Sequence, residues 1–244
     1  MAIDYTKRPT PPAATNPAAP APSASPATPA APPSPAAPQG AVSLTKAAPT
    51  VSLTKRGQST GQLRVNLNWN ARPAAPSGGN FLKRAMAASS PAIDLDLGCL
   101  YELTDGSKSV VQALGGLFRN REDGPPVVWL DGDDRSGTNS GGENLYVDLG
   151  QLARIKRILV FAFIYEGVPN WAAADGVVTL MPAQGAPIEV RLDESREGAS
   201  MCAIALLENR GGELVVNREV QFYTGQSALD EAYGWGMKWK AGRK

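Results

Sequence analysis

The sequence predicts an all-β fold, an antiparallel β-sandwich that follows a disordered Pro/Ala-rich N-terminal segment. The first observation is alternation, because apolar and polar residues follow one another in many short stretches, as in half-buried strands. The second is the turns between these stretches, which are rich in Gly, Asn and Asp. The third is the lack of helical crossovers in the pattern, which favours antiparallel pairing of the strands.

The N-terminal segment has a composition that cannot form a core. Residues 9–40 are almost entirely Pro, Ala, Ser and Thr, so they offer few large apolar groups to offset the entropy of ordering the backbone. Proline also favours extended conformers, which is typical of a semi-rigid tether. We therefore expect a disordered tether over 1–40 and a single β-sandwich domain over 41–244.

The first half of the predicted domain holds seven strand-like stretches. VSLTK occurs twice, at 42–46 and 51–55, and RVNLNW follows at 64–69. In IDLDLGCLYEL (93–103) the odd-numbered apolar residues share one face, and Asp94 and Asp96 share the other. SVVQAL follows a turn at 104–107. VVWL leads into an acidic loop, and NLYVDL leads out of it.

The second half contains the most apolar stretch. RILVFAFIYEG (157–167) is apolar on both faces, which predicts a central strand that is covered on each side. VVTLMP and IEVRLD come next, and residues 209–212 predict the turn of a hairpin within 201–223. Only FLKRAMAA (81–88) and SALDEAYGW (227–235) are expected to be helical.

Charge and residue usage narrow the function. The net charge is +1, but 92–148 holds eleven carboxylates against four Lys or Arg, so this segment carries −7. Such a segment repels itself unless something neutralises it. The chain has no histidine, which excludes a Ser-His-Asp triad and His-ligated zinc or iron. Cys99 and Cys202 lie in apolar stretches and are expected to be core residues.

The acidic loop WLDGDDRSGTNSGGENLYVDL (129–149) is the candidate site. Calcium takes six to eight oxygen ligands, so one short loop seldom supplies them all, and Asp94 and Asp96 form a second acidic pair. Glycines in the loop let carbonyl groups turn inward. The loop is not an EF-hand, because Arg135 occupies the fifth position from Asp131 and the flanks are strand-like.

The order of these motifs resembles the TerD-domain family of tellurite-resistance and stress proteins, in its TerA-like branch. The matching motifs are VSLTK, VNLNW, DLDL, GDDRSG…GGENLYVDL and ILVFAFIYEG, from about residue 41 to 225. The resemblance implies a calcium-binding β-sandwich without catalytic turnover, working in a membrane-associated multiprotein complex. It implies metal ligation by Asp94, Asp96, Asp133, Asp134 and Glu143, with Glu166 as a weaker candidate. Asp131 adds a further charge to the loop and is a second weaker candidate.

One departure from the family pattern bears on calcium. The family's paired aspartates before the closing glutamate fall on Gly141 and Gly142 here. Because the number of charges helps to set calcium affinity, we expect one retained site at most, or a weakened pair. A scaffold that has lost calcium is the alternative that this departure leaves open.

The sequence gives less support to an enzyme or to a membrane-surface module. A metal-dependent hydrolase needs an identifiable base or nucleophile, and the sequence shows no such signature, so we do not expect an enzyme. A calcium-dependent membrane-surface or ligand-binding module is an open alternative. The N-terminus lacks the apolar region of a signal peptide, which predicts a cytoplasmic protein, with peripheral attachment to the inner face of the membrane left open. Partners are expected to be other stress-resistance proteins and not nucleic acid.

Overall fold

The computed structural model describes residues 40–71, 93–132, 142–167, 171–192, 194, 196 and 198–239. These residues belong to one compact unit, 37–244. The predicted tether lies outside the described residues except for Gly40, and so does the predicted helix at 81–88. Both stay predictions.

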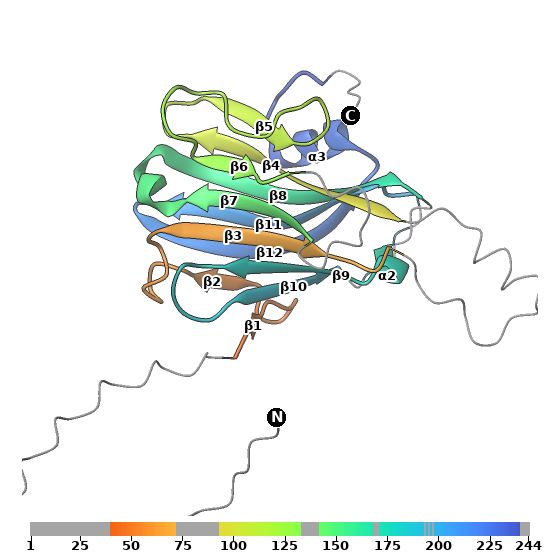
Figure 1. Cartoon of the computed structure of the whole chain (residues 1–244), viewed down its shortest axis with the longest axis horizontal. Coiled ribbons are helices and arrows are strands. Elements are labelled where there is room, and N and C mark those ends of the chain that lie inside the picture. Colours follow the sequence, from red (N-terminus) through yellow and green to blue (C-terminus); the bar gives the residue numbers. More distant parts are fainter. Residues whose placement is uncertain are drawn as a thin grey trace, which may run out of the picture. The chain divides into compact units, whose positions relative to one another are not determined.

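The described chain forms two six-stranded sheets (Figure 1). Sheet A has the order β1, β10, β9, β3, β7, β6, with bounds Val42–Ser43, Ile188–Leu192, Gly176–Met181, Gln62–Asn68, Glu143–Asp148 and Val128–Leu130. Sheet B has the order β2, β12, β11, β8, β4, β5, with bounds Thr50–Ser52, Glu213–Tyr223, Met201–Arg210, Ile155–Glu166, Asp94–Leu103 and Lys108–Gln112. All neighbours pair antiparallel except β1 and β10, which are parallel. The predicted sandwich is confirmed.

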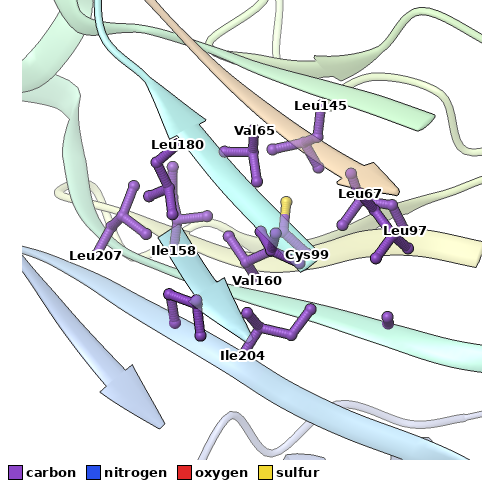
Figure 2. Packing of buried hydrophobic residues seen from close by; sticks show 14 of the residues in the cluster. Val65, Leu67, Leu97, Cys99, Leu145, Ile158, Val160, Leu180, Ile204 and Leu207 are labelled. Carbon is purple, nitrogen blue, oxygen red and sulfur yellow. The ribbon is translucent and has the colours of Figure 1, made fainter. Parts of the chain in front are cut away.

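The core lies between the sheets and follows the predicted alternation. On β4, Leu95, Leu97, Cys99 and Tyr101 belong to the inter-sheet core, as expected from their odd positions. Figure 2 shows Leu97 and Cys99 packed among Leu67 of sheet A and other apolar side chains. Full burial of each such side chain contributes about 1.5–3 kcal/mol, so this layer provides the main stabilisation.

The two copies of VSLTK enter different sheets. In the first copy, β1 pairs with β10 in sheet A, whereas in the second copy β2 pairs with β12 in sheet B. Leu44 and Leu53, the leucines of the two copies, are both buried. The repeat therefore supplies one short edge strand and one buried leucine to each layer.

The outer face of sheet B has a cover of its own. Helix α3 (Gln226–Tyr233) and the following residues bring Leu229 and Trp235 onto Leu159, Phe161 and Phe163 of β8. This second cluster explains why β8 is apolar on both faces. The predicted helix and the predicted central strand are both confirmed.

Three local features complete the described fold. The hairpin between β11 and β12 turns at Gly211 and Gly212, both with positive φ, as the sequence predicts. The 3-10 helix η1 (Leu149–Arg154) begins at Asp148, whose side chain accepts from the backbone N–H of Gly150, and the sequence analysis did not predict it. The short α2 (Trp171–Ala174) was also not predicted. Within the described ranges, no helix has the length and apolar character needed to cross a membrane.

Candidate metal site at one end of the sandwich

Several strands begin or end together at one end of the sandwich. Antiparallel pairing sets Asp94, where β4 begins, opposite Glu166, where β8 ends. It likewise sets Glu143, where β7 begins, opposite Leu67 near the end of β3. These termini lie at the same end in Figure 1. The fold therefore brings together acidic residues that are far apart in the sequence.

Asp94 and Asp96 lie on the outer side of β4. Their even positions place them opposite the core-facing leucines, and strand geometry separates them by about 7 Å. They are nevertheless buried, with 7% of Asp94 and 0% of Asp96 exposed. Burial of a carboxylate is costly unless its charge is compensated, so this end of β4 is built for a compensated negative charge.

Glu143 approaches β4 from the opposite sheet. It is 3% exposed and shares the inward side of β7 with Leu145 and Val147. Its Oε2 accepts a hydrogen bond of 2.5 Å from the backbone N–H of Leu97. That N–H is accessible because the register of β5 with β4 begins only at Gly98. Glu143 thus ties the two sheets together at the backbone of Leu97 by a strong charge-assisted bond.

The residues around Glu143 hold the exit of the acidic loop against β3. Gly142 has φ +61°, and a Cβ added there would overlap the carbonyl oxygen of Leu67. The Asn66 side chain donates to the carbonyl oxygen of Glu143 at 3.4 Å and to Oδ1 of Asn144 at 2.9 Å. Position 142 therefore requires glycine in this backbone.

Asp131 does not join this group. Its Oδ2 accepts from the Asn144 side chain at 3.0 Å and from the Tyr146 hydroxyl at 3.4 Å. Asn144 and Tyr146 alternate with the core-facing residues of β7, so these contacts place the Asp131 carboxylate on the outer face of sheet A. Asp131 and Glu143 lie on opposite faces of that sheet.

The other predicted ligands are placed less fully. Glu166 is exposed at the end of β8, opposite Asp94 in the register. Asp133 and Asp134 lie outside the described residues, so their assignment stays a prediction. Within the described part of the chain, no group of three or more His, Cys, Asp or Glu side chains is arranged to hold a metal ion.

The type of donor atom at this end of the sandwich suits a hard cation. Asp94, Asp96 and Glu143 offer carboxylate oxygens only, which suits calcium and not a soft metal. One oxygen of Glu143 accepts from the backbone N–H of Leu97, so part of this carboxylate already serves to hold the two sheets together. A full shell therefore needs oxygens from further residues. Alternation in ENLYVDL places Glu143 on the same side as Leu145, but no pattern in the sequence indicates its contact with Leu97 or its support from Asn66.

The cysteines lie away from this chemistry. Cys99 and Cys202 are free and fully buried, and burial raises the pKa of both thiols above the ordinary range. A buried thiol that stays protonated is a poor nucleophile. The prediction that both cysteines are core residues is confirmed.

Comparison with known proteins agrees with the motif order. Over 203 residues the chain is 46% identical to the tellurium resistance protein TerA of an Alcaligenes species. The resemblance to the TerD-domain family, in its TerA-like branch, is confirmed. The match covers 83% of this chain but 58% of that protein, so this chain spans little more than half of its TerA relative. No family model matches the chain.

One solved structure shares the fold, and a second is similar at a lower score. The crystal structure of a protein of unknown function superposes with a TM-score of 0.51 at 16% identity, covering 70% of this chain and 95% of that one. A homologue of the telluride resistance protein TerD from Streptomyces coelicolor A3(2) gives a TM-score of 0.46 at 18% identity, with the same coverage. At these identities the likeness concerns the sandwich and not its ligands.

Proposed function

We propose that this TerA-like chain is a non-catalytic, calcium-binding protein that contributes to resistance against tellurite and related chemical stress. One observation carries the calcium part, namely the burial of Asp94 and Asp96 at the same end of the sandwich as the contact between Glu143 and Leu97. The name of the TerA relative supports the resistance part. The absence of histidine from the sequence supports a role without turnover.

Asp94 and Asp96 are the primary ligands in this proposal. Asp133 and Asp134 supply the remaining charge from the loop, while Glu143 fixes the loop exit and contributes a carboxylate oxygen. A bound calcium ion supplies charge compensation and links the segments that provide its ligands. The proposal is for one site, because Gly141 and Gly142 remove two carboxylates from the family's pattern.

Calorimetric titration of the full chain with calcium tests the loop's part in the site. We expect one binding event for the wild type and a loss of its heat in Asp133→Ala/Asp134→Ala. Asp131→Asn is the matched control, because Asp131 lies on the outer face of sheet A and its variant should bind like the wild type. Absence of calcium heat from the wild type would leave the alternative of a scaffold that has lost its ion.

The cellular role is tested separately. In a tellurite-sensitive host that carries the other resistance proteins, the wild-type gene should raise tolerance and Asp94→Asn/Asp96→Asn should not. A Cys99→Ala/Cys202→Ala variant with normal expression should protect like the wild type, since both thiols are buried and protonated. Loss of protection in that variant would favour direct thiol chemistry with tellurite instead.

We further propose that the protein works in the cytoplasm within a multiprotein stress-resistance complex, which can lie at the inner face of the membrane. A calcium-dependent membrane-surface module is the competing proposal. Sedimentation with anionic vesicles, with calcium and with a chelator, separates the two. Pelleting of the isolated protein only with calcium supports the module, whereas pelleting only together with partner proteins supports the complex.

A further inference from the structure

A cationic groove lies between strand β5 and the residues that follow α3, at the sheet edge where β5 and α3 appear in Figure 1. The groove encloses about 400 Å³, enough for a small organic ligand. Lys108, Arg121 and Lys238 line it from three separate segments, and no carboxylate is among its described lining residues. Trp239 and Met237 form an apolar part of the wall.

Two of these cations are available to a ligand. Within the described ranges, the side chains of Arg121 and Lys238 form no ion pair, and both residues are exposed. Lys108 is already partly used, since its Nζ donates to the carbonyl oxygen of Trp235 at 3.3 Å and lies 3.7 Å from Glu102. The free positive charge of the groove therefore comes mainly from Arg121 and Lys238.

Carboxylates on the neighbouring elements are occupied elsewhere. Both oxygens of Glu122 accept from the Tyr101 hydroxyl at 3.1 Å, and one also accepts from Asn120. Glu102 is held by Lys156 and Arg157, each at 2.6 Å. Within the described residues, neither acid forms an ion pair with Arg121 or Lys238.

The tail that bears Lys238 and Trp239 is held in place by a buried acid. Asp230 is 4% exposed and accepts from the backbone N–H of Gly236 at 2.7 Å and of Met237 at 3.0 Å. Its Oδ2 also accepts from Nε1 of Trp239 at 3.1 Å. A groove whose aromatic wall is fixed before binding loses less entropy when a ligand enters.

We propose that this groove binds a nucleoside polyphosphate, a function additional to calcium binding and independent of it. Arg and Lys recognise phosphate oxygens through charge-assisted hydrogen bonds. A fixed tryptophan offers a surface on which a base stacks. A ligand with a charged phosphate chain and a flat base matches both halves of the groove, whereas a bare inorganic anion uses only one.

Calorimetric titration with ATP in EDTA tests this proposal on the full chain. We expect one ATP per chain, with affinity at least about tenfold weaker in Arg121→Ala/Lys238→Ala, since this variant removes the two cations that form no ion pair within the described residues. Arg119→Ala is the matched control, because Arg119 is an exposed arginine of the same loop that does not line this groove. Its affinity should equal that of the wild type.

The aromatic half is tested with two further variants and one further probe. Trp239→Ala should weaken ATP about tenfold, and Trp239→Phe should retain most of the affinity because the stacking surface remains. Inorganic tripolyphosphate should bind more weakly than ATP. No ATP binding, equal binding of tripolyphosphate, or an unaffected Arg121→Ala/Lys238→Ala variant would overturn the proposal. The chelator keeps these results independent of the calcium site.

Discussion

The two ends of strand β4 carry buried carboxylates in different surroundings. Glu102, near one end, is 3% exposed and is compensated by the chain itself, with Lys156 and Arg157 at 2.6 Å and Lys108 at 3.7 Å. Asp94 and Asp96, at the other end, are buried on the same side of the strand next to the acidic loop. The first end is a finished ionic network, and the second is the end at which we propose a calcium ion.

This contrast shows that burial of an acid does not by itself indicate a ligand site. Glu102 is as buried as Glu143, yet its partners are cations contributed by β5 and β8. Arg157 is held further, with its guanidinium carbon 3.8 Å from the centroid of the Trp235 ring. An acid with a structural role, such as Glu102, is therefore distinguished from a proposed calcium ligand by the charged groups around it. The two also differ in whether their mutation changes the effect of calcium on the free energy of unfolding.

The largest expected effect is at the Glu102 end. Arg157 and Lys156 are the two cations nearest to Glu102, and Arg157→Met removes the first of them. The buried Glu102 carboxylate is then undercompensated, which costs about 3–5 kcal/mol of unfolding free energy. The loss also includes the contact with Trp235. Urea denaturation should give the same loss with calcium and with EDTA. A loss that appears only in EDTA would contradict the independence of the two ends.

Calcium should stabilise the protein through the other end. At a free calcium concentration of about 100 times Kd, binding to the native state alone adds about 2.7 kcal/mol to the free energy of unfolding. Asp94→Asn/Asp96→Asn should fold and should lose this increment. Urea midpoints measured with and without calcium give the comparison. An increment retained in the variant would place the ion elsewhere.

A smaller effect is expected at the loop exit. Gly142→Ala forces a side chain into a left-handed conformation and against the carbonyl of Leu67, at a cost of about 1–3 kcal/mol. Because the shift displaces Glu143 from Leu97, calcium affinity should fall as well. Gly211→Ala is a matched control, since Gly211 also has positive φ but an added Cβ there meets nothing within 4 Å. It should destabilise less and bind calcium normally.

The smallest effect concerns acid pH. Burial alone raises the pKa of the Glu102 carboxyl, but hydrogen bonds from Lys156 and Arg157 outweigh it and hold the pKa below its ordinary value. The unfolded state therefore takes up this proton first, so the stabilisation is present above the ordinary glutamate pKa of about 4.3 and is lost as pH falls through the lower folded pKa. Glu102→Gln should show a shallower loss of stability below that pH in EDTA. An unchanged slope would contradict the assignment.

The sequence alone predicted the strands of the two sheets better than the segments that pack on the outer face of sheet B. Alternation in IDLDLGCLYEL correctly separated the core-facing residues of β4 from Asp94 and Asp96, because a strand repeats every two residues. The double-sided apolar character of β8 correctly indicated cover on both faces. It did not identify α3 and Trp235 as that cover, since contacts between distant segments leave no periodic signal in the sequence. The equal VSLTK copies likewise gave no sign that they enter different sheets.

The sequence named the acidic residues of the candidate site, and their role as metal ligands stays a prediction. The motif order indicated Asp94, Asp96 and Glu143, and the fold brings these residues to one end of the sandwich. Asp131 was grouped with them by proximity in sequence, but its contacts with Asn144 and Tyr146 lie on the other face of sheet A. A spacing in sequence could not reveal this, because the face on which a loop-flanking residue lies depends on the strand that follows.

The most direct test sets the two ends of β4 against each other in one calcium titration by calorimetry. Asp96→Asn and Glu102→Gln each remove one buried negative charge from the same side of the same strand. We expect calcium heat in the wild type and in Glu102→Gln, and none in Asp96→Asn. Retained heat in Asp96→Asn, or heat lost from Glu102→Gln while that variant remains folded, would contradict the assignment of the ion to the Asp94 and Asp96 end.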